Sequence, residues 1–138
     1  MRLISLLLTI VAASAVSPAL ASYTVQDANA GAQLRAEASI AVSLLYFPCH
    51  RAPAMEAPLA RYEAFKAGLT NDRQKIDLAI AEADFDYQMS LVDIDCPDPD
   101  APETAQRDEI NAAVVTSVLD RMDTLKIPAD LAEPEKGQ

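Results

Sequence analysis

The sequence has no tryptophan, one histidine and only three glycines in 138 residues, and aromatic residues make up just 5% of it. β-Sandwiches and β-barrels need turn glycines and strands rich in aromatic and β-branched residues, so this composition disfavours both. Hydrophobic residues make up 51% of the chain, which is enough for a packed core and argues against disorder. The composition therefore predicts an all-α protein, and the length predicts a single domain.

Positive charge is also scarce. The chain has 11 lysines and arginines against 21 aspartates and glutamates, for a formal net charge of −10. Such a surface repels phosphate backbones and anionic lipids. We therefore expect no nucleic-acid partner, and a protein partner with a basic surface is the one that the charge favours.

The N-terminus has the pattern of a secretory signal peptide. A short positive start, Met1-Arg2, precedes an apolar run that ends at Val11, and Pro18 is followed by the small-residue site Ala19–Ala21. We predict that residues 1–21 are a signal peptide and that the protein is periplasmic or secreted. No later segment reaches the length of a membrane span, so we expect no membrane insertion after cleavage.

Cysteine is limited to Cys49 and Cys96. In an exported chain an even number of cysteines predicts a disulfide, and here only one intramolecular pairing exists. The bridge would close a loop of about 48 residues, which contributes roughly 4 kcal/mol of stability in the chain-entropy model. Two cysteines and one histidine are too few for a structural zinc site, so no metal is predicted.

Prolines, capping residues and apolar spacing predict four helices: Val25–Phe47, Pro58–Lys66, Asp72–Ile94 and Pro102–Lys126. Thr70 to Asp72 supply N-cap candidates for the third helix, and Gly68 is placed as a C-cap glycine of the second.

Apolar residues three or four positions apart are taken as the core-facing sides of these helices. In the second helix they are Leu59, Tyr62 and Phe65. In the third helix, which has the clearest pattern, they are Ile76, Ile80, Ala83, Tyr87, Leu91 and Ile94. In the fourth helix they are Ile110, Val114, Val118, Met122 and Leu125, and Val115 and Leu119 widen that side.

Four helices with short connections predict a small antiparallel four-helix bundle with one disulfide. The helical domain is expected to span residues 22–126, and residues 127–138 are expected to form a flexible tail. Cys49 follows the first helix and Cys96 follows the third. In an up-down-up-down order these two ends lie at the same end of the bundle, where a bridge could join them.

An acidic stretch lies between Lys75 and Arg107, where the chain has no lysine or arginine. Part of it, Asp93, Asp95, Asp98 and Asp100, has a spacing that superficially suggests a calcium loop. The glycine and the bidentate glutamate of such a loop are missing, so no calcium site is predicted. These four aspartates are either a solvated face or a docking face for a basic partner.

No set of residues typical of an enzyme is found. His50 adjoins Cys49, but a catalytic Cys-His pair needs converging side chains and a third orienting group. Haem attachment needs Cys-x-x-Cys-His, of which the first cysteine is absent, so no cofactor is predicted. We expect an exported non-enzymatic interaction protein, in the form of an inhibitor or immunity protein acting on a periplasmic toxin or hydrolase. The alternatives are a periplasmic acid-stress chaperone and a carrier of a small ligand.

Overall fold

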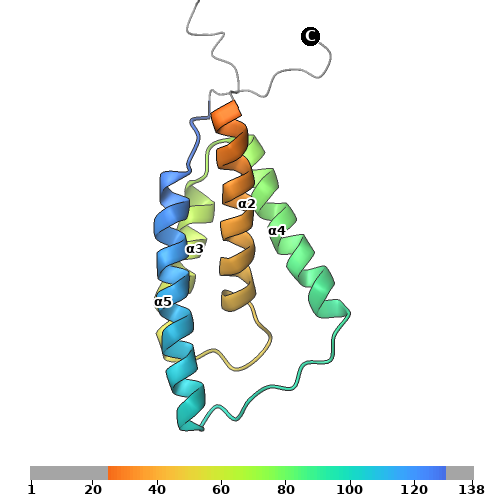
Figure 1. Cartoon of the computed structure of the whole chain (residues 1–138), viewed down its shortest axis with the longest axis vertical. Helices are drawn as coiled ribbons and strands as arrows, with labels where there is room; N and C mark the ends of the chain where they lie inside the picture. The colour runs from red at the N-terminus through yellow and green to blue at the C-terminus, as the bar shows by residue number, and fades with distance from the viewer. Residues whose placement is uncertain (1–24, 130–138) are drawn as a thin grey trace, which may run out of the picture.

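The structure is a computed structural model, and it describes residues 25–129. They form α-helices and one short 3-10 turn, joined by loops, with no strand in this range (Figure 1). The elements are α2 (Val25–Leu45), η2 (Pro53–Met55), α3 (Glu56–Gly68), α4 (Asp72–Ser90) and α5 (Pro102–Thr124). The prediction of an all-α protein is confirmed. The predicted signal peptide and residues 130–138 lie outside the described residues.

The helix ends follow local chemistry, but several differ from expectation. α3 spans Glu56–Gly68 and not Pro58–Lys66, and α5 ends at Thr124 and not at Lys126. Asn71 caps α4, because its side-chain oxygen accepts a hydrogen bond from the backbone N–H of Gln74 at 3.2 Å. α4 ends at Ser90 and not at Ile94, and α2 ends at Leu45 and not at Phe47. Gly68 is the last residue of α3 and not a left-handed cap, and the backbone of the next residue, Leu69, is extended.

The core forms around α2, which packs mainly against α4 and then against α5 (Figure 1). Ala38 and Ala41 are fully buried on α2, and their small side chains allow the neighbouring helices to approach closely. In a square up-down-up-down bundle the first and third helices are diagonal partners, whereas here α2 and α4 are the most extensively packed pair. The elements thus form a helical bundle in which α2 is the central member.

The predicted core side of the third helix is wrong. Ile76, Tyr87 and Leu91 are exposed by 54%, 66% and 66%. The buried side of α4 lies on the opposite surface of the helix and consists of Gln74, Asp77, Leu78, Ala81 and Phe85. In the second helix Tyr62 and Phe65 are buried as predicted, and Leu59 is partly buried.

On α5 the predicted core side is correct only in its C-terminal half. Val118 and Met122 are fully buried there, but Ile110 and Val114 are exposed by 56% and 41%. Val115 and Leu119, expected only to widen the core side, lie at its centre. The buried side of α5 is therefore shifted around the helix by one residue position, toward Val115 and Leu119. The shift arises because α2 and α3 both pack on α5 from that side.

The segment after α5 is fastened to the start of α4. The Gln74 amide group donates to the carbonyl oxygen of Leu125 at 2.7 Å, and its oxygen accepts from the backbone N–H of Ile127 at 2.9 Å. Asn71 donates to the carbonyl oxygen of Pro128 at 3.0 Å. Ile127 is buried, so the packed part of the chain continues beyond residue 126, where the tail was expected to begin.

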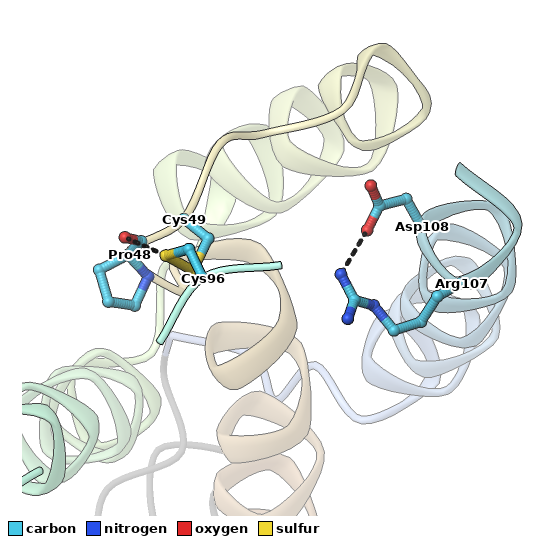
Figure 2. The surroundings of a disulfide bond; sticks show 5 residues. All are labelled: Pro48, Cys49, Cys96, Arg107 and Asp108. Atoms are coloured by element: carbon cyan, nitrogen blue, oxygen red, sulfur yellow. Dashed lines mark hydrogen bonds and ion pairs between the residues drawn. A yellow bond between two sulfur atoms is a disulfide. The ribbon is translucent and has the colours of Figure 1, made fainter. Parts of the chain in front are cut away.

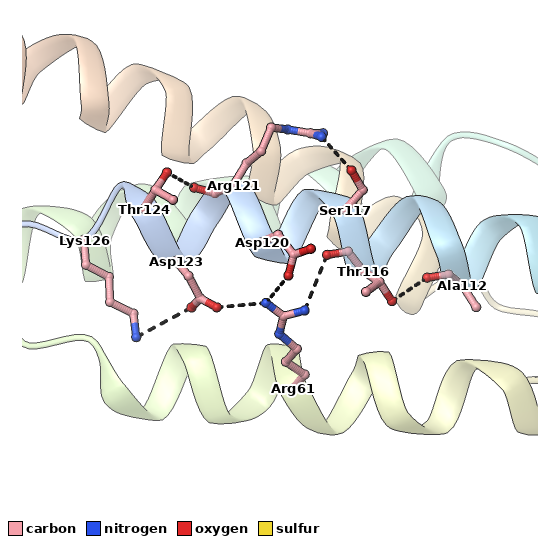
Figure 3. A network of polar contacts seen from close by, with 9 residues as sticks. All are labelled: Arg61, Ala112, Thr116, Ser117, Asp120, Arg121, Asp123, Thr124 and Lys126. Carbon is pink, nitrogen blue, oxygen red and sulfur yellow. Dashed lines mark hydrogen bonds and ion pairs between the residues drawn. The ribbon is translucent and has the colours of Figure 1, made fainter.

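Ion pairs join the outer surfaces of the helices. Arg61 on α3 donates to Asp120 at 2.6 Å and to Asp123 at 2.9 Å on α5 (Figure 3). Arg121 on α5 forms a two-pronged pair with Glu37 on α2, at 2.7 and 2.9 Å. These pairs are largely exposed, so each adds little stability. Together they connect α5 to α3 on one side and to α2 on the other.

Candidate binding site at the disulfide end

The disulfide joins the loop after α2 to the loop after α4. Cys49 and Cys96 are bonded, with their Cα atoms 5.6 Å apart, as the sequence predicted. The Cys96 sulfur lies 3.6 Å from the carbonyl oxygen of Pro48 (Figure 2). A disulfide sulfur carries no proton to donate, so we treat this as a packing contact. The bridge holds the acidic α4–α5 loop against the end of α2.

The four aspartates singled out from the sequence lie on that loop, and all four are exposed. Asp98 also shapes the loop. Its side-chain oxygen accepts the backbone N–H of Asp100 at 3.0 Å, and its carbonyl oxygen accepts the Thr104 hydroxyl at 2.6 Å. Asp93, Asp95 and Asp100 are the other three members of the set, and they are exposed to solvent. The loop is therefore held at Cys96 and at Asp98, with its charges outward.

A pocket of about 270 Å³ lies beside the disulfide. Its apolar lining includes Leu44, Leu45 and Met55, and the disulfide residue Cys49 and the loop residue Pro97 also contact it. A smaller recess of about 140 Å³ adjoins it and shares several of its lining residues. Concave sites with an apolar lining and a few polar groups are the usual form of a small-ligand site.

The polar lining of the pocket carries both signs of charge. Arg51, Arg107 and Asp108 line it together with His50, and Arg107 lies 3.6 Å from the carboxylate of Asp108, away from the disulfide (Figure 2). Sequence reasoning missed this group, because it noted Arg107 only as the end of the acidic stretch. The single usable signal is that Cys49 precedes His50 and Arg51, so that a Cys49–Cys96 bridge brings these two residues to the acidic loop.

A second recess, of about 390 Å³, lies among α2, α3 and α4. The buried Tyr62 donates its hydroxyl to Glu82 at 2.9 Å, and Lys66 donates to the same carboxylate at 2.9 Å. Tyr46 donates to Glu63, and its ring packs edge-on against that of Tyr62. Burial, and then the hydrogen bond to Glu82, raises the pKa of Tyr62 above its usual value. These groups satisfy one another and cross-link three helices.

Neither a candidate metal site nor a candidate membrane span is found among residues 25–129. No group of three or more histidine, cysteine, aspartate or glutamate side chains in that range could hold a metal ion. No helix of the described part combines the length and the apolar character that crossing a bilayer requires. The disulfide is compatible with a periplasmic or extracellular location.

Comparison with known proteins does not add a family. The chain matches no protein-family model, and no curated protein or solved structure matches it.

Proposed function

We propose that this protein is an exported, non-enzymatic binding protein and that its disulfide end engages a protein partner with a basic surface. The observation that carries the proposal is the exposed acidic loop, which is fastened at Cys96 and organised by Asp98. A fastened loop loses less conformational entropy on binding than a free one, so its charges can contribute to affinity and to the rate of association. An inhibitor or immunity protein that covers a toxin or hydrolase is the form we propose.

The proposal includes an antiparallel order of the helices. The joining of the two loops by the disulfide and the course of the chain in Figure 1 support this order. It places the start of α5 and the start of α3 at the same end as the acidic loop. The cations and carboxylates of that end then form one surface with two signs of charge.

The test is capture of the partner with a charge variant and a matched control. The oxidised protein is produced by export from the full-length gene and used to capture binders from the envelope of its own host. The variant replaces Asp93, Asp95 and Asp100 with Asn, and it keeps Asp98 because that residue shapes the loop. The control also neutralises three exposed carboxylates, at Asp72, Asp86 and Glu109.

We expect one stoichiometric partner that the control retains and the variant loses. High salt should also release the partner, since exposed charges are already screened beyond a Debye length of about 8 Å at physiological ionic strength. A complex that the three substitutions do not weaken would remove the acidic loop from the interface. Mixing the purified pair and measuring the association rate against salt would then quantify the electrostatic part.

A second candidate function is favoured by the pocket beside the disulfide. Its apolar lining and its two arginines, Arg51 and Arg107, fit a small amphipathic molecule that carries a carboxylate. The probe is octanoate, titrated by calorimetry into the wild-type protein and into Arg107→Met. Saturable binding that the substitution weakens supports a carrier, and no binding to the wild type contradicts it.

A further inference from the structure

One side of α4 carries an apolar stripe that no other helix of the described chain covers. The stripe consists of Ile76, Ile80, Ala83, Tyr87 and Leu91, and we call it the α4 stripe. Three of its members are exposed by 54% or more, while α2 packs against the opposite side of the helix (Figure 1). At 3.6 residues per turn, the five positions fall within about 80° of one another around the helix axis. They form a continuous line of apolar surface in water.

The α4 stripe is complementary to itself when it is reversed. In an antiparallel pair centred between residues 83 and 84, Ile76 of one copy lies opposite Leu91 of the second copy. Ile80 lies opposite Tyr87, and the small Ala83 lies beside its own equivalent, where the two helix axes approach most closely. A surface that pairs with its own reversal is what a two-fold symmetric contact requires. We infer that a second copy of this chain covers the α4 stripe, with the two α4 helices antiparallel.

The charges beside the stripe select this orientation. Arg73 and Lys75 lie at the start of α4, and no lysine or arginine follows before Arg107. In the antiparallel pair the start of α4, where Arg73 and Lys75 offset Asp72 and Asp77, lies beside the carboxylate-rich end of α4 in the second copy. In a parallel pair the carboxylate-rich ends of the two helices, which carry Glu82, Asp84 and Asp86, would lie side by side. Charges of like sign across a helix pair are destabilising, so the parallel arrangement is disfavoured.

The carboxylate nearest the two-fold axis is already compensated. Asp84 would approach its equivalent in the second copy, but Arg35 on α2 pairs with it at 3.3 Å within each chain. A single helix pair buries less surface than the roughly 1,600 Å² of a standard stable interface. The dimer is therefore weak and depends on concentration.

Disulfide cross-linking of the full oxidised protein tests the geometry directly. Ala83→Cys places two thiols at the axis and cross-links the chain to itself under mild oxidation. Ile76→Cys alone does not cross-link, but it does so when mixed with Leu91→Cys. Ala60→Cys, on the exposed surface of α3, is the control for random collision. Cross-linking of Ala83→Cys no faster than this control overturns the inference, and so does self-cross-linking of Ile76→Cys, which indicates a parallel pair.

Sedimentation equilibrium gives a second, independent readout. The wild type shifts from monomer to dimer as its concentration rises, and Tyr87→Ser with Leu91→Ser shifts the dissociation constant upward by at least tenfold. Both side chains are exposed, so circular dichroism should show an unchanged helical fold. Lys75→Glu weakens the dimer, because it adds a carboxylate beside the acidic end of α4 in the second copy. A wild type that stays monomeric up to its solubility limit overturns the inference.

Discussion

Replacement of Gln74 by leucine should strongly destabilise the protein, although it exchanges a polar side chain for an apolar one at a buried position. Gln74 is fully buried, and its side chain satisfies two backbone groups, the carbonyl of Leu125 and the N–H of Ile127. Leucine has a similar size but can neither donate nor accept a hydrogen bond. The substitution therefore leaves two backbone groups without partners and loosens the segment that closes the bundle.

The expected loss can be worked from these two bonds. A buried donor or acceptor left unsatisfied costs about 1–3 kcal/mol, so two of them cost about 2–6 kcal/mol. The total stability expected for about 100 packed residues is of the order of 5–15 kcal/mol. Urea denaturation followed by circular dichroism should thus show a much lower midpoint with an unchanged slope.

The matched control is Gln88→Leu, at an exposed position on the same helix, which we expect to change the stability by no more than about 0.5 kcal/mol. A loss below about 1 kcal/mol for Gln74→Leu would refute the reasoning, because it would mean that the unpaired backbone groups are not costly. An equal loss for the two variants would show that the effect is not specific to the buried position of Gln74.

Two further predictions concern the disulfide end and the buried tyrosine. Replacing Cys49 and Cys96 with Ser should lower the free energy of unfolding by up to about 4 kcal/mol, and it should raise hydrogen exchange in the acidic loop as measured by mass spectrometry. The free energy of unfolding should also fall above about pH 10, by up to about 1.4 kcal/mol per pH unit. The reason is that the folded state keeps the Tyr62 proton, which the unfolded state loses. In thermal melts at alkaline pH, Tyr62→Phe should reduce this loss of stability, whereas Tyr87→Phe, at an exposed position, should not. If Tyr62→Phe loses stability as steeply as the wild type, the loss does not come from Tyr62.

The features that could be predicted from the sequence depend on local chemistry. Proline placement and the Asn71 cap set the helix ends to within a few residues. The disulfide followed from the cysteine count and from the helix order, since each cysteine lies in the loop that follows a helix. Gly68 shows the limit of such rules, because a glycine near a helix end need not adopt the left-handed conformation when an extended Leu69 can bury its own side chain instead.

The candidate site could be predicted only in part, because it depends on which loops meet. The acidic aspartates are visible in the sequence, but the polar residues that line the pocket beside them are not visible as a group. His50, Arg51 and Arg107 come from two segments that the bridge and the packing of α5 bring to one pocket. Asp98 could not be distinguished from its neighbours either, since its role in the loop is a matter of backbone geometry.

The misassigned side of α4 has a physical cause that also bears on the inference about a second copy. The side that packs against α2 contains Gln74 and Asp77, so its hydrophobic pattern is interrupted and resembles a solvated face. Gln74 serves on that side because the segment after α5 offers it both an acceptor, the carbonyl of Leu125, and a donor, the N–H of Ile127. The uninterrupted apolar pattern lies on the other side, where no other helix of the described chain packs against it. Large apolar side chains at helical spacing on an outer surface are costly to a monomer, and burying them against a partner removes that cost. The strongest hydrophobic pattern of the sequence is thus accounted for by contact between chains and not by the core of one.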